Sequence, residues 1–228
     1  MSFQIIFLLF MIYSFLGWCM EVICKSIEYK RFINRGFLMG PYCPIYGYGA
    51  IVMVVLLKDF SHNVFLLFIM SMLVCSILEY LTSFVMEKLF CARWWDYSNK
   101  KFNINGRVCL RNSLCFGLLA ILLVYFINPF ILDILNEINP TVINILTFIL
   151  LVIFILDNVI SYTIINSFSS TVKKSTFDNT EEITKYVKEE FLKRNYFSKR
   201  LIYAYPNFQT RVKRKLEEIK EAISSSLE

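Results

Sequence analysis

The sequence is poor in the residues that build metal and redox sites. It has one histidine, His62, and seven cysteines, none of which form a Cys-x-x-Cys pair. The pairs Cys19/Cys24 and Cys109/Cys115 do not have the spacing of metal ligands. We therefore expect neither a metal centre nor a disulfide framework, and interpret the cysteines as small buried apolar residues of a chain facing a reducing cytosol.

Signatures of soluble catalysis are also missing. The sequence contains no Gly-x4-Gly-Lys-Ser/Thr, His-Glu-x-x-His or Gly-x-Ser-x-Gly motif. The chain is therefore not expected to hydrolyse ATP through a Walker-type site of its own, and no cofactor is expected. The missing signatures weigh against an enzyme, although they leave the question open.

Charge is missing over long stretches. Hydrophobic residues make up 57% of the chain, more than the roughly 45–50% of soluble domains. Five apolar runs cover residues 3–20, 37–57, 64–85, 112–132 and 143–168, and about 20 such residues cross a bilayer core. The sequence predicts an all-α polytopic membrane bundle of about five spans. The first run has no basic region before it and no cleavage site after it, so we interpret it as a retained helix.

Lysine and arginine alternate from one connection to the next. The first loop has four, the second only Lys58, the third six, the fourth none and the tail thirteen. By the positive-inside bias, the N-terminus lies outside, whereas loops one and three and the tail are cytoplasmic. We expect a transmembrane domain over 1–171 and a cytoplasmic amphipathic helical tail over 172–228. The net charge of +6 then serves orientation and contact with the lipid bilayer, not nucleic acid.

The tail carries two apolar stripes at helical spacing. Ile183, Tyr186, Val187 and Phe191 form the first. The second follows Pro206, with Asn207 as a candidate cap, and consists of Phe208, Val212, Leu216, Ile219, Ile223 and Leu227. This helix would pack on the protein's own loops, form a coiled coil that makes the chain a homo-oligomer, or lie on the membrane surface.

Several acids fall within the apolar runs. A carboxylate there costs at least a few kcal/mol unless it is paired, protonated or hydrated. Glu21, Glu79, Glu87 and Asp157 are predicted in the inner half, near arginines 35, 93, 107 and 111 of the cytoplasmic loops. They would form ion pairs at helix ends or line a polar cavity open to the cytoplasm. We expect Arg35 to contact Glu21 or Glu79, and Arg107 to contact Asp96.

The first loop, residues 34–49, reads NRGFLMGPYCPIYGYG. Its prolines and glycines predict irregular backbone, with a continuous helix beginning only near Pro44. Irregular backbone within a membrane must be covered by protein or water. This segment would be either the wall of a binding site, as in transporters, or a tight turn at the membrane surface.

The third loop contains RWWDYS (93–98) and NINGRVCL (103–110). Asp96 with Asn103, Asn105 and Arg107 would form a compact hydrogen-bonded knot, or Arg107 would grip a phosphate or carboxylate bidentately. We expect the first and third loops to fold against each other and close a polar pocket at the cytoplasmic face.

These motifs, with FLGWCME (15–21) and EYLTS (79–83), resemble the bacterial ABC-transporter type IV family of permease-like membrane proteins. The resemblance is dense over 14–117 and extends to AYPNF (204–208) and LEEIK (216–220). It implies a permease partnered by a separate ATPase subunit.

The leading hypothesis is therefore a transport-related membrane subunit with a polar site in its cytoplasmic half. The candidate substrate-binding residues are Glu21, Arg35, Glu79, Asp96, Tyr97, Asn105 and Arg107. Two alternatives stay open. The same acids and Tyr97 would serve an enzyme acting on a lipid or polyprenyl headgroup, with Arg35 or Arg107 holding phosphate, or the tail would make the chain a scaffold that docks a partner.

Overall fold

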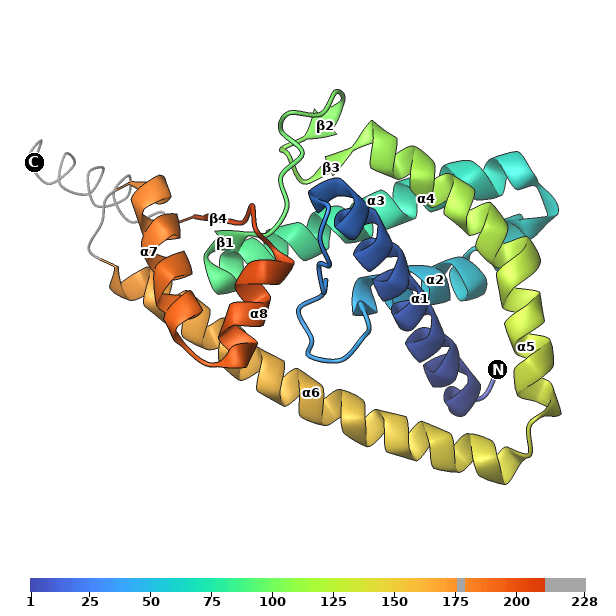
Figure 1. The fold of residues 1–228 in the computed structure, drawn as a ribbon. Coiled ribbons are helices and arrows are strands. Elements are labelled where there is room, and N and C mark those ends of the chain that lie inside the picture. The colour runs from blue at the N-terminus through green and yellow to red at the C-terminus, as the bar shows by residue number, and fades with distance from the viewer. Residues whose placement is uncertain (176–178, 212–228) are drawn as a thin grey trace, which may run out of the picture.

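The computed structural model of the protein describes residues 1–175 and 179–211. Within them the fold is all-α, with four long apolar helical stretches (Figure 1). These are α1 (Phe3–Tyr29), α3 (Val64–Phe90), the run Leu110–Glu137 and α6 (Pro140–Lys174). Each has at least 27 residues and is about 40 Å or more in length, enough to cross a hydrocarbon core. The prediction of an all-α membrane protein is confirmed.

The third long stretch is divided by a π-helical turn. It consists of α4 (Leu110–Leu122), the turn Leu123–Ile127 and α5 (Asn128–Glu137). Pro129 has no backbone N–H and would clash with the carbonyl of Tyr125 in a regular helix. The turn widens the ladder at this point. The Asn128 side chain there accepts a hydrogen bond from the Tyr13 hydroxyl at 2.8 Å, which joins the turn to α1.

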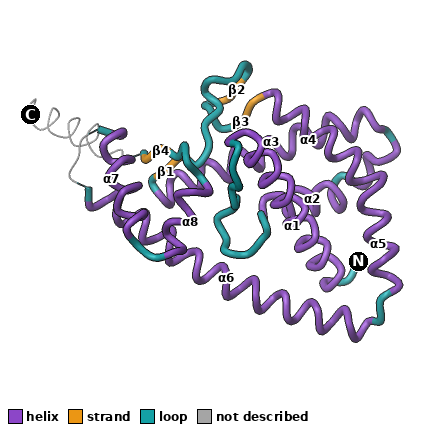
Figure 2. Tube along the Cα trace, in the orientation of Figure 1, coloured by secondary structure: helices purple, strands orange, loops and turns teal. Residues whose placement is uncertain are grey.

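The fifth apolar helix, α2 (Pro44–Leu56), is short and begins at Pro44, as predicted. The Cys43 amide donates to the Ser14 carbonyl at 2.9 Å, so α2 starts halfway along α1. Segment 30–43 must therefore run back from the end of α1 as irregular chain, drawn as a loop in Figure 2. The 13 residues of α2 then cover about 20 Å beside the first half of α1.

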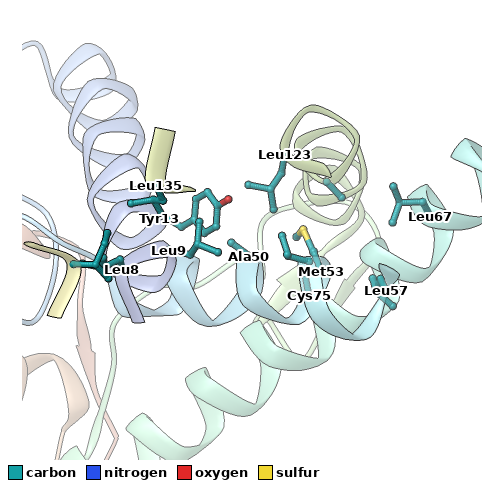
Figure 3. Close-up of a cluster of buried hydrophobic side chains, with 13 residues drawn as sticks. Leu8, Leu9, Tyr13, Ala50, Met53, Leu57, Leu67, Cys75, Leu123 and Leu135 are labelled. Carbon is teal, nitrogen blue, oxygen red and sulfur yellow. The ribbon is translucent and has the colours of Figure 1, made fainter. Parts of the chain in front are cut away.

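The main apolar core lies between α1, α2, α3 and the π-helical turn (Figure 3). Gly17 and Gly47 allow close approach of α1 and α2, because a Cβ at either position would collide with Tyr46 or with Ser14 and Phe10. The helix η1 (Lys58–His62) then leads to α3, whose first turn is capped by the Asn63 side chain.

Two short sheets and two helices complete the described fold. Strand β1 (Ala92–Arg93) pairs with β4 (Gln209–Thr210), and β2 (Asn103–Ile104) pairs with β3 (Val108–Cys109). The tail helices are α7 (Thr180–Lys193) and α8 (Tyr196–Ala204). They pack on the end of α6 and on the third loop, in a second core centred on Trp94 and Phe168. The tail thus covers part of the chain's own loops.

The two predicted tail stripes have different outcomes. Ile183, Val187 and Phe191 of the first are buried on α7, and Tyr186 is partly buried. Phe208 of the second is also buried, but residues 208–211 form loop and strand, so the prediction of a helix from Asn207 is wrong there. Pairing of β4 with β1 holds this stretch extended. The rest of the second stripe, from Val212 on, lies outside the described residues.

Candidate functional site

The irregular segment between α1 and α2 is held by one carboxylate. Oδ1 of Asp157, on α6, accepts the Met39 amide at 2.7 Å, and Oδ2 accepts the Gly40 amide at 2.7 Å and the Tyr42 hydroxyl. The Ser161 hydroxyl donates to Oδ1 at 2.9 Å. Asp157 is buried. It therefore supplies acceptors for backbone donors that cannot be left unpaired in a membrane interior.

A first polar cluster joins α1, α2 and the first loop. Nε of Arg35 lies 3.1 Å from Oε2 of Glu21, and the Tyr46 hydroxyl donates to Oε1 at 2.6 Å. The prediction that Arg35 contacts Glu21 or Glu79 is confirmed for Glu21. Arg35 also donates to the Ala204 carbonyl at 2.6 Å and lies 4.2 Å from the ring centre of Tyr205.

Glu79 of α3 adjoins this cluster and is only 8% exposed. The Tyr97 hydroxyl donates to its Oε1 at 3.2 Å, and the Asn112 side chain lies beside the pair. Oε2 is buried and has no partner in hydrogen-bond geometry among the described residues. Burial is the main cause that raises the pKa of Tyr97, so this phenol stays protonated.

A second cluster surrounds Glu87, two turns further along α3. Its Oε2 lies 3.1 Å from Nη2 of Arg107 and 2.9 Å from Nε of Arg93. Arg107 also donates to the Ser83 hydroxyl at 3.1 Å. Both arginines are therefore bound to α3.

The prediction that Arg107 contacts Asp96 is wrong. The β2–β3 turn, with positive φ at Asn105 and Gly106, delivers Arg107 to α3. Asp96 instead accepts from the amide of Ser98 at 2.9 Å and from its hydroxyl at 2.6 Å, and lies 3.6 Å from Arg93. Burial opposes ionisation of Asp96, but the Ser98 hydrogen bonds and Arg93 outweigh it and lower its pKa.

The third loop is closed by its own hydrogen bonds. Oδ1 of Asn103 accepts the Gly106 amide at 3.0 Å, and the Tyr97 amide donates to the Gly106 carbonyl at 2.7 Å. Asn105 is exposed at the rim, where its amide donates to the Tyr80 hydroxyl at 2.9 Å. The predicted knot is therefore formed only in part: Asp96 and Asn103 bond within the loop, whereas Asn105 and Arg107 bond to α3. Asn105 also lies apart from the first cluster.

The first and third loops fold against each other, as predicted, through aromatic rings. The rings of Phe37 and Trp94 meet edge to face at 4.9 Å, and Tyr205 stacks on Phe37 at 4.4 Å. Tyr205, from the tail, therefore packs at the contact between the two loops, where the sequence analysis predicts no tail residue. The polar pocket remains a prediction.

The structure thus gathers Glu21, Arg35, Glu79 and Tyr97, and places Asp96 and Arg107 in a neighbouring cluster. Sequence reasoning missed the site roles of Tyr46 and Asp157. A lone acid in an apolar run, opposite a segment rich in glycine and proline, was the available signal for Asp157. In residues 1–175 and 179–211, no three His, Cys, Asp or Glu side chains are grouped to hold a metal ion.

Long apolar helices with buried charge clusters at one end define a multi-helix integral membrane protein. The sequence matches the family described as "Putative ABC-transporter type IV" over residues 8–162, about two thirds of the chain. The chain belongs to this family. The matched range includes both clusters and Asp157, and ends before the tail helices. No curated protein and no solved structure matches the chain.

Proposed function

We propose that the protein is a permease-like subunit of a transporter, with its polar site formed by Glu21, Arg35, Glu79 and Tyr97. The broken segment beside this cluster is the observation that carries the proposal. In transporters, such discontinuous stretches line substrate and ion sites, because their freed backbone groups and half-helix ends face the ligand. The family's description as an ABC transporter agrees with this function.

We further propose five spans, with segment 30–43 and α2 together forming the second. The alternation of lysine and arginine then places the N-terminus outside and the tail in the cytoplasm. Single cysteines at Ser61 and Asn139 should react with an impermeant maleimide in intact cells, whereas those at Ser98 and Ser198 should react only after lysis. Labelling of the Ser98 position in intact cells would reverse the orientation.

A separate ATPase would power such a subunit, since the chain has no nucleotide-binding signature of its own. The test is purification of the full chain in mild detergent, followed by measurement of ATP hydrolysis by what copurifies. We expect an ATPase whose activity falls at least tenfold when Arg35 is changed to Gln. Glu28→Gln is the control, because Glu28 is exposed and, within residues 1–175 and 179–211, pairs only with Lys25 one turn away. Purification without any ATPase would contradict the proposal.

The alternatives receive different support. A phosphate-binding enzyme needs free arginines, but Arg35 and Arg107 are ion-paired to Glu21 and Glu87, so the contacts do not favour it. A docking scaffold is favoured by two exposed aromatic side chains of α8, Tyr196 (71% exposed) and Tyr203 (53%). If deletion of the tail removed partner capture and nothing else, the scaffold would replace the transporter.

A further inference from the structure

Glu79 differs from the other acids around the two clusters in having no cation. Arg35 is bound to Glu21, and both Arg93 and Arg107 are bound to Glu87. Asp96 lies near Arg93 and Arg211. Among the described residues, no lysine, arginine or histidine nitrogen lies within 4 Å of the Glu79 carboxyl. Its charge, if present, would be uncompensated.

The groups that lie around Glu79 come from the third loop, α4, α1 and α3 itself. Tyr97 of the third loop and Asn112 of α4 lie against it, and Cys75 lies one turn earlier on α3. Glu21 of α1 is close enough to act on it electrostatically. All of these groups are neutral or negative. A second negative charge beside Glu21 is disfavoured, because like charges raise the free energy of ionisation.

Hydrogen bonding points the same way. An ionised carboxylate offers about four lone-pair sites for donors, and burial without them carries a large free-energy penalty. Glu79 receives one long hydrogen bond at Oε1, from Tyr97, and the Asn112 side chain lies close to the carboxyl as a second polar neighbour. Oε2 is nevertheless both buried and without a partner in hydrogen-bond geometry in the described part of the chain. By contrast, the two oxygens of Asp157 share four donors. The environment of Glu79 suits a neutral acid.

We propose that Glu79 is a proton-binding site, whose carboxyl is a neutral acid in this closed arrangement. When the Tyr97 contact opens, water reaches the group, the O–H bond breaks, the electron pair stays on the carboxylate and the proton passes to water. This inference deepens the proposed function, because it makes the proton a ligand of the same site. Proton binding itself, however, does not depend on transport.

The test is infrared difference spectroscopy on the full chain in lipid nanodiscs, between neutral and alkaline pH. We expect the carbonyl band of a protonated carboxylic acid at neutral pH, lost in Glu79→Gln and kept in the matched control Glu28→Gln. Tyr97→Phe should shift the frequency of the band, because the carbonyl loses its hydrogen bond. Absence of the band in the wild type, or its survival in Glu79→Gln, would overturn the proposal.

A second measurement uses only the wild-type protein, so it tests the proposal even if Glu79→Gln does not fold. A hydrophobic carbodiimide reacts only with protonated carboxyls, so in the wild-type protein mass spectrometry should find the adduct on Glu79 and none on ion-paired Glu87. Adducts on both residues, or on neither, would count against the site. A positive result without any associated ATPase would sustain the proton site and defeat only the transporter proposal.

Discussion

Replacing Asp157 by alanine should open the broken segment without unfolding the bundle. The change leaves the Met39 and Gly40 amides without acceptors, and each unpaired buried donor costs about 1–3 kcal/mol. Two such losses give about 4 kcal/mol. Asp157→Asn keeps one oxygen and should lose about half as much. Since 1.4 kcal/mol is a factor of ten, the open segment should become about a thousandfold more populated in the alanine variant.

Thiol labelling followed by mass spectrometry measures this opening. Cys43 ends the segment and is buried, as is Cys75 on α3. In Asp157→Ala, we expect the maleimide reaction of Cys43 to accelerate by orders of magnitude while that of Cys75 stays slow. Asn158→Ala is the matched control, because the Asn158 side chain is exposed and its one hydrogen bond in the described part of the chain is to the Phe154 carbonyl of its own helix. Equal protection of Cys43 in wild type and Asp157→Ala would refute the assigned role of Asp157.

Two further predictions concern partly or fully buried charges. Arg35→Met strands Glu21 and should cost about 3 kcal/mol, seen as a lower thermal midpoint. Arg200→Met should cost much less, because Nε and Nη2 of Arg200 are buried without partners among the described residues and its Nη1 makes only a long hydrogen bond of 3.4 Å to the Gly36 carbonyl. Burial also lowers the pKa of Arg200. Equal losses in the two variants would contradict this difference. The pKa of Asp96 is lowered in the folded state. Its ionised form therefore stabilises the fold above its unfolded pKa of about 4, and this stabilisation is lost as pH falls through the folded pKa. The thermal unfolding midpoint, measured by tryptophan fluorescence, should drop on acidification less steeply in Asp96→Asn than in wild type.

The features that the sequence predicts correctly depend on interactions between residues that are close together in the chain. Apolar length sets the long helices, and Pro44 fixes the start of α2 because its ring presets φ and its missing N–H is not needed in a first turn. The sequence also limited the partner of Arg35 to Glu21 or Glu79, because both acids are predicted near the cytoplasmic ends of their spans. These features need no knowledge of how distant helices meet.

The contacts that the sequence analysis assigned wrongly depend on how segments far apart in the chain pack together. Their closeness within one loop predicts a contact between Arg107 and Asp96. The tight turn at Asn105 instead directs Arg107 to α3, where Glu87 also binds Arg93. Phe208 has helical spacing, yet β4 pairs with β1 and places its ring against Trp94 and Phe168. In both cases a contact between segments far apart in the chain overrides a local pattern.

The tail and the polar site are mechanically connected through Arg35. Its guanidinium donates to the Ala204 carbonyl at the end of α8, stacks on Tyr205 and binds Glu21. A displacement of α8 must therefore break these contacts or carry Arg35 away from Glu21. In the second case a positive charge moves away from the polar site, which makes ionisation of neighbouring Glu79 still less favourable. A partner that moved the tail would thus change how tightly the site holds its proton, with no contact to the site itself.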